Sequence, residues 1–193
     1  MSEMQKIERF TLGRMPTPIG TMLVVFDRQE RLRALNFDDF EDRMARALGL
    51  AYGRKNIAMV EGPVCQSVMR KLQAYLDGDI TAIDDIPVET AGTQFQREVW
   101  AALRTIPGGK TETYGGIART IHRPKAVRAV GAANGSNPVA VVVPCHRVIG
   151  SNGLLTGYGG GLDRKRWLLK HEGIEINLED DRSAPLFAMS ENG

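Results

Sequence analysis

Short runs of alternating apolar and polar residues occupy positions 7 to 36. The runs ERFTLG, TMLVVFD and LRALNF are separated by MPTPIG and RQE. β-rich runs divided by proline, glycine and polar turn residues are typical of consecutive short strands. We therefore predict an antiparallel β-meander at the start of the chain.

Two segments that follow change to a helical period. The stretch DDFEDRMARALGL, residues 38 to 50, has acids first, an apolar repeat of about 3.6 residues and arginine late, which predicts a helix. A second helix is predicted over 63 to 77, with one apolar stripe formed by Val64, Val68, Leu72 and Leu76. Cys65 lies beside this stripe, and we interpret it as a packing residue.

The stretch DGDITAIDDIPVETAGT, residues 77 to 93, lacks helical periodicity and suits a connection between domains. We predict an N-terminal domain over 1–91, a C-terminal domain over 92–175 and a flexible tail over 176–193. Thr93 followed by Gln96 is a capping-box pattern, and it opens a helix that ends at PGGK.

Further along, YGGIARTI and KAVRAVGAAN predict two short helices separated by HRPK, which has the outline of a helix-turn-helix. The second helix has unusually small side chains, which would let it approach a partner closely or pack tightly in the core, and both could hold on opposite faces. The run VAVVVP predicts a buried strand ending at Cys145, and DRKRWLLKHEG predicts a last helix.

Positive charge is concentrated in one segment of a nearly neutral chain. Residues 104 to 128 hold six Lys or Arg against one acid, for a local charge of +5, whereas the whole chain has +2. Such a segment indicates either a solvated basic face or a surface for an anionic partner, with nucleic acid as the leading candidate.

Several classes of protein are disfavoured by composition. No apolar run approaches the roughly 20 residues that span a bilayer, and MSEMQKIERF lacks the apolar core of a signal peptide, so we expect a cytoplasmic protein without a membrane partner. The two cysteines, Cys65 and Cys145, have no spacing typical of a zinc site or a disulfide framework. We expect no metal.

Cys145 stands beside a histidine in VVVPCHRVIG, which raises the question of a reactive thiolate. Adjacent side chains of a strand point to opposite faces, so His146 reaches the sulfur only if the chain turns at Pro144 or a water relays the proton. Glu172 is a candidate to orient the imidazole.

The residues that surround Cys145 resemble the active-site region of the O6-alkylguanine-DNA alkyltransferases, the methylated-DNA protein-cysteine methyltransferases. The likeness runs in order from FQREVW through RAVGAANGSNP and PCHRVIG to GYGGGLDRKRWLLKHEG. The N-terminal part resembles the zinc-free constitutive bacterial form. The resemblance implies an α/β (α+β) fold, with an RNase-H-like N-terminal domain and a mainly helical C-terminal domain that carries the helix-turn-helix.

The resemblance also implies a role for each matching residue. Cys145 would accept the alkyl group, His146 would act on it through a water, Glu172 would orient His146, and Asn137 would tie the recognition helix to the active-site turn. Tyr114 would bind the base and protonate its N3 atom, and Arg128 would fill the space left by the extruded nucleotide. DNA contacts are assigned to Arg119, Lys125, Arg128, Ala129 and Gly131. The substrate pocket is assigned to Val148, Tyr158, Gly159 and Gly160.

The implied activity is a single, irreversible transfer from O6-alkylguanine, and from O4-alkylthymine, in double-stranded DNA to Cys145, by a monomer that needs no cofactor. Gly159 departs from members that have a hydroxyl residue there, so that contact would come from backbone amides. Three alternatives stay open: a helix-turn-helix transcriptional regulator with a structural cysteine, a cysteine hydrolase that uses Cys145, His146 and Glu172, and a non-catalytic lesion sensor.

Overall fold

A computed structural model describes residues 7–54, 56–62 and 65–175 of the 193-residue chain. The predicted tail over 176–193, and Val64 at the start of the second predicted helix, lie outside the described residues. None of the helices in these ranges has the length and apolar character needed to cross a membrane.

The N-terminal half contains a four-stranded mixed sheet. Strands β1 (Glu8–Met15), β2 (Met22–Phe26) and β3 (Leu32–Phe37) pair antiparallel, as the meander prediction requires. A fourth strand, β4 (Ile57–Glu61), pairs parallel to β1 and gives the order β3-β2-β1-β4. The pattern of the sequence did not reveal β4.

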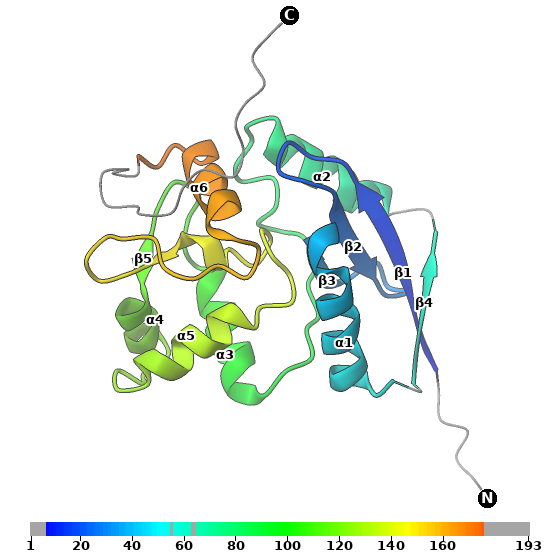
Figure 1. The fold of residues 1–193 in the computed structure, drawn as a ribbon, viewed down its shortest axis with the longest axis horizontal. Helices are drawn as coiled ribbons and strands as arrows, with labels where there is room; N and C mark the ends of the chain where they lie inside the picture. The colour runs from blue at the N-terminus through cyan, green and yellow to red at the C-terminus, as the bar shows by residue number, and fades with distance from the viewer. Residues whose placement is uncertain (1–6, 55, 63–64, 176–193) are drawn as a thin grey trace, which may run out of the picture.

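Two helices cover opposite faces of this sheet (Figure 1). A short 3-10 turn, η1 (Asp38–Phe40), leads into α1 (Glu41–Tyr52), which buries Met44 and Leu48 against one face. Helix α2 (Gln66–Leu76) places Val68, Leu72 and Tyr75 in the core on the other face. Both predicted helices are confirmed, and Cys65 packs at the edge of that core.

The C-terminal half is mainly helical. Its elements are α3 (Gln94–Leu103), β5 (Glu112–Thr113), α4 (Tyr114–Thr120), α5 (Val127–Gly135), η2 (Cys145–Arg147), β6 (Val148–Ile149) and α6 (Leu162–His171). The two short helices α4 and α5 pack on α3 and on each other, as expected for a helix-turn-helix. The chain leaves α4 through His122, whose φ is 56°.

One hydrophobic core runs through both halves. It joins the sheet residues Val24, Leu35 and Phe37 to Leu103 of α3 and Leu168 of α6. The predicted boundary near residue 91 stays a prediction, and any two units that meet there share this core.

The predicted strand over VAVVVP is wrong. Val139 forms a single bridge to Leu35, after which the backbone turns, with Val141 at a φ of 68°. The Asn137 side chain supplies what a neighbouring strand would have supplied: its Oδ1 accepts from the Val139 amide at 3.0 Å, and its Nδ2 donates to the Val143 carbonyl at 2.8 Å. Buried valines with β propensity can therefore form a turn here, because the Asn137 side chain hydrogen-bonds the backbone amide of Val139 and the backbone carbonyl of Val143.

The capping box predicted at Thr93 is present. Thr93 Oγ1 accepts from the Gln96 amide at 3.2 Å, and Gln96 Oε1 accepts from the Thr93 amide at 2.9 Å. These bonds satisfy two amides at the start of α3 that have no partner within the helix.

Replacing Thr93 by Ala should therefore lower the free energy of unfolding by about 1 kcal/mol, because α3 loses its side-chain cap. Urea denaturation of the full chain measures the change. Thr93→Ser is the matched control, since it keeps the hydroxyl and should remain close to the wild type. Equal losses in both variants would contradict a capping role.

Candidate active site

Cys145 begins the 3-10 turn η2, so the chain does turn after Pro144. The thiol is buried, and its Sγ accepts a hydrogen bond from Asn137 Nδ2 at 3.0 Å. Burial raises the pKa of Cys145, and the Asn137 bond and the charge of Lys165 offset this only in part. The sulfur therefore rests as a thiol at neutral pH, and it needs a base to become a nucleophile.

His146 lies fully buried and is held by one ring nitrogen. Its Nε2 is 2.9 Å from Glu172 Oε1, whereas Nδ1 is buried without a hydrogen-bond partner among the described residues. Burial lowers the pKa of His146, although Glu172 opposes the shift, so the ring is neutral at pH 7. A neutral imidazole that donates Nε2–H to a carboxylate has a bare Nδ1, which is the form that can accept a proton.

Glu172 follows the last turn of α6 and is almost completely enclosed. Arg147 binds it with two nitrogens, Nε to Oε2 at 2.8 Å and Nη2 to Oε1 at 2.9 Å. Burial alone would raise the pKa of Glu172, but the hydrogen bonds and charges of His146 and Arg147 outweigh it and hold the pKa well below its ordinary value. The carboxylate therefore stays ionised beside a neutral histidine.

The short parallel pair β5–β6 places Tyr114 beside this turn. Thr113 pairs with Ile149, so α4 begins next to the residues that follow Cys145. The Tyr114 hydroxyl accepts from Thr156 Oγ1 at 3.2 Å, and its ring lies near Gly131 of α5. An added Cβ at Gly131 would meet that ring at ordinary van der Waals distance.

The four predicted pocket residues are buried or half-buried, and each lies against other residues of the C-terminal half. The ring of Tyr158 meets that of His146 edge-on, with centroids 6.5 Å apart, and its buried hydroxyl has no partner among the described residues. Gly159 faces the Gly135 carbonyl at the end of α5. Val148 is buried, and its carbonyl accepts from Lys165 Nζ at 2.6 Å. Gly160 is buried nearby and its carbonyl accepts from Arg164.

Four of the five predicted DNA-contacting residues lie on the exposed side of the helix pair, and the fifth, Gly131, is half-buried beside the Tyr114 ring. Arg119, Lys125, Arg128 and Ala129 are exposed, whereas Val130 and Ala133 of α5 face the core. In the part of the chain that the structure describes, none of these three cations forms an ion pair or hydrogen bond. One face of the small-sided α5 packs in the core, as one of the two interpretations predicts, and the other face is exposed, so close approach to a partner stays a prediction.

Three residues of the site were missed by the sequence analysis. Arg147 and Lys165 are both buried, although long cationic side chains are normally solvated, and desolvation lowers the pKa of Lys165 to about 8. Tyr75 of α2 donates to Glu172 Oε1 at 2.8 Å. The sequence did contain one signal for Tyr75: it falls on the apolar stripe of α2, and a tyrosine hydroxyl that is buried requires a hydrogen-bond partner.

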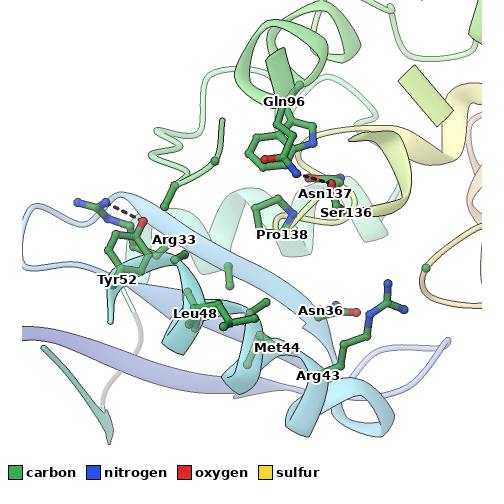
Figure 2. A pocket seen from close by; sticks show the side chains of 18 of the residues that line it. Arg33, Asn36, Arg43, Met44, Leu48, Tyr52, Gln96, Ser136, Asn137 and Pro138 are labelled. Atoms are coloured by element: carbon green, nitrogen blue, oxygen red, sulfur yellow. Dashed lines mark hydrogen bonds between the residues drawn. The ribbon is translucent and has the colours of Figure 1, made fainter. Parts of the chain in front are cut away.

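A groove of about 490 Å³ separates α1 from the segment 135–138. Figure 2 shows Arg43, Met44 and Leu48 on one wall, with Gln96 and Asn137 on the other. Asn137 and Gly159 line the groove but Cys145 does not. Asn137 thus stands between the groove and the thiol.

Replacing Glu172 by Gln should destabilise the fold by about 3–5 kcal/mol at pH 7, because Arg147 is left buried without a counter-charge. The pKa of Glu172 is lowered in the folded state from an ordinary 4.5, so its stabilisation is complete above that pH and is lost as the pH falls below it. The difference in the free energy of unfolding between the wild type and Glu172→Gln should therefore decrease below pH 4.5.

Urea denaturation between neutral pH and about pH 3 tests this linkage. Glu98→Gln is the control, since the partly exposed Glu98–Arg123 pair should contribute less than about 1 kcal/mol. A difference in the free energy of unfolding that stays constant down to about pH 3 would show that ionisation of Glu172 does not stabilise the fold.

Comparisons with known proteins identify the relatives of this chain. A model of the family described as 6-O-methylguanine DNA methyltransferase, DNA binding domain, matches residues 94–174. Methylated-DNA–protein-cysteine methyltransferases of Shigella flexneri and Salmonella typhimurium are 48% and 49% identical over 83% of this chain and 94% of each relative. The solved structure of Mycobacterium tuberculosis OGT in complex with DNA covers 85% of this chain and 92% of its own, with 40% identity and a TM-score of 0.70. By its sequence, its mixed α/β fold and its cysteine turn, the chain belongs to the family of methylated-DNA–protein-cysteine methyltransferases.

Proposed function

We propose that this protein repairs double-stranded DNA by transferring the alkyl group of O6-alkylguanine, and of O4-alkylthymine, irreversibly to Cys145. The observation that carries the proposal is the arrangement of three side chains. The Cys145 thiol is buried against Asn137, and the adjacent His146 is neutral, fixed by Glu172 and free at Nδ1.

Proton transfer comes first in this mechanism. Because burial disfavours the free thiolate, loss of the thiol proton must be coupled to a base, and the unpaired Nδ1 of the neighbouring His146 is the proposed acceptor. A water between Sγ and Nδ1 relays the proton. Glu172 balances the imidazolium while the charge is present.

The sulfur then attacks the saturated alkyl carbon. An S–C bond forms as the C–O6 bond breaks, and guanine leaves with the electron pair. Tyr114 supplies a proton to the N3 atom of the leaving base and regains one from the imidazolium, so the sum of the steps is the exchange of a thiol proton for an alkyl group. The thioether has no activated carbonyl for water to attack, so each molecule acts once.

The buried sulfur requires the target base to leave the duplex. Cys145 is only 5% exposed, which is too little for contact with a base inside a stack. Extrusion costs a few kcal/mol, and less for a damaged, poorly paired base. Arg128 projects from the open face of α5, where it can stack in the space that the nucleotide leaves.

The exposed cations of α4 and α5 supply phosphate contacts that do not depend on sequence, as scattered lesions require. A transcriptional regulator or an acyl hydrolase uses only part of this arrangement. The regulator has no need for the buried His146–Glu172 pair, and the hydrolase has no need for the basic helix pair.

Incubation with duplex DNA that contains O6-methylguanine should add one methyl group per chain, located at Cys145, because this thiol is the acceptor. Intact-protein and peptide mass spectrometry measure it. Cys145→Ser should gain no methyl and still bind DNA, since the change is small and leaves the exposed cations of α4 and α5 unaltered. Cys65→Ser is the matched control and should be methylated fully. A methyl group elsewhere would refute the mechanism.

Arg128→Ala should slow repair in duplex DNA about 10- to 100-fold, because part of the cost of base extrusion is no longer offset. Reaction with free O6-benzylguanine needs no extrusion and should keep its rate. Single-turnover assays with both substrates measure the two rates, and Arg70→Ala, which removes an exposed arginine from α2, serves as control. Equal slowing on both substrates would remove the extrusion role.

A further inference from the structure

Tyr75 reaches the active-site carboxylate from the other half of the molecule. It lies on α2, with its side chain fully buried, and belongs to the apolar stripe with Val68 and Leu72. Its O–H donates to Glu172 Oε1 at 2.8 Å. The family model begins at residue 94, so Tyr75 lies outside the matched region.

The bonds of Glu172 show what this donor contributes. Among the described residues, Oε1 accepts from Tyr75, His146 and Arg147, whereas Oε2 accepts only from Arg147. Tyr75 therefore competes for the same oxygen that orients the imidazole. Among the described partners of this carboxylate, it alone comes from the N-terminal half.

Tyr75 is itself fixed in place by α6. Its backbone carbonyl is 2.6 Å from His171 Nε2, and the two rings meet edge-on with centroids 5.1 Å apart. Burial, followed by the charge of Glu172, raises the pKa of Tyr75, so the phenol keeps its proton at neutral pH. The hydroxyl is thus a permanent donor held at a fixed position.

We propose that Tyr75 is a positioning residue for alkyl transfer: its hydroxyl holds Glu172 in the orientation that keeps His146 Nδ1 available to the Cys145 thiol. The proposal rests on the proposed function of this site. An additional donor on Oε1 also weakens the pull of the carboxylate on the imidazole proton, so His146 stays a neutral base rather than an imidazolium.

Several titratable and charged groups surround His146 on the elements packed against it, and Glu172, Arg147 and Lys165 shift its pKa. The surrounding groups are Glu172 after α6, Arg147 on η2, Lys165 on α6, Tyr75 on α2, and Cys145 and Tyr158 in the site itself. Of these, only Tyr75 can lose its hydrogen bond to Glu172 without a change in the net charge of the site.

Tyr75→Phe keeps the ring packed and removes only the hydroxyl. Without it, Glu172 attracts the imidazole proton more strongly, so the pKa of His146 should rise. The variant should transfer methyl about tenfold more slowly at neutral pH, and the acid limb of its pH–rate profile should move to higher pH. Tyr52→Phe is the matched control: it removes another N-terminal tyrosine hydroxyl, which accepts from Arg33, and should change neither quantity.

Two readouts separate the possible outcomes. Single-turnover methyl transfer gives the rate profile, and NMR titration of isotope-labelled histidine follows His146, which is one of only three histidines, directly. When Glu172 is already replaced by Gln, the additional change Tyr75→Phe should not slow methyl transfer further. A stability loss with an unchanged pH profile and unchanged His146 titration would overturn the proposal and leave the proposed function intact.

Failure of the wild type to accept a methyl group would instead overturn the proposed function, whereas the His146 titration would still test Tyr75. If Tyr75→Phe does not fold, the wild-type protein supplies the measurement. The ring-carbon resonance of Tyr75 next to its hydroxyl should shift as His146 titrates. A resonance that is insensitive to that titration would count against the coupling.

Discussion

A single buried carboxylate organises the centre of this molecule. An ionised carboxylate that leaves water loses several kcal/mol of solvation, which only close donors can restore. Glu172 obtains them from three places at once: the guanidinium of Arg147, the imidazole of His146 and the hydroxyl of Tyr75. The cysteine turn, the end of α6 and helix α2 are therefore held together by a group that also sets the protonation of the proposed base.

The thiol depends on a second polar group, the Asn137 amide. That side chain binds the Val139 amide, the Val143 carbonyl and the Cys145 sulfur. The bonds that replace a strand ladder therefore come from the same residue that contacts the nucleophile. Asn137 comes two residues after the end of α5, so the helix with the exposed arginine and the buried sulfur share one short connection.

The accuracy of the sequence prediction depended on how local each signal was. The capping box at Thr93 and the meander of β1 to β3 were predicted correctly because their turn residues and apolar repeats lie within a few positions. The strand over VAVVVP was wrong because β propensity cannot distinguish a ladder from a turn that a side-chain amide satisfies. Strand β4 is short and pairs only with a distant partner, so nothing local marked it.

The predictions for the site were likewise correct where a local signal existed and incomplete where the contact is long-range. Cysteine, histidine and glutamate were identified by their chemistry and by the family resemblance, and the structure does bring His146 and Glu172 into contact. Arg147, Lys165 and Tyr75 were missed, because a cation on a helix is normally solvated and a tyrosine on an apolar stripe normally packs. Their burial follows from long-range folding, which brings the ends of α2 and α6 together.

The shared core links the sheet to the reactive turn by backbone as well as by packing. Leu35 of β3 donates to the Pro138 carbonyl at 3.0 Å and accepts from the Ala140 amide at 2.9 Å, one residue on either side of Val139. The turn that carries Cys145 is therefore anchored to the N-terminal sheet on one side and to Glu172 on the other. Because a nucleophile and its base must be held within a fraction of an ångström, a rigid sheet behind this turn is a physical reason for the chemistry of the C-terminal half to depend on the N-terminal half.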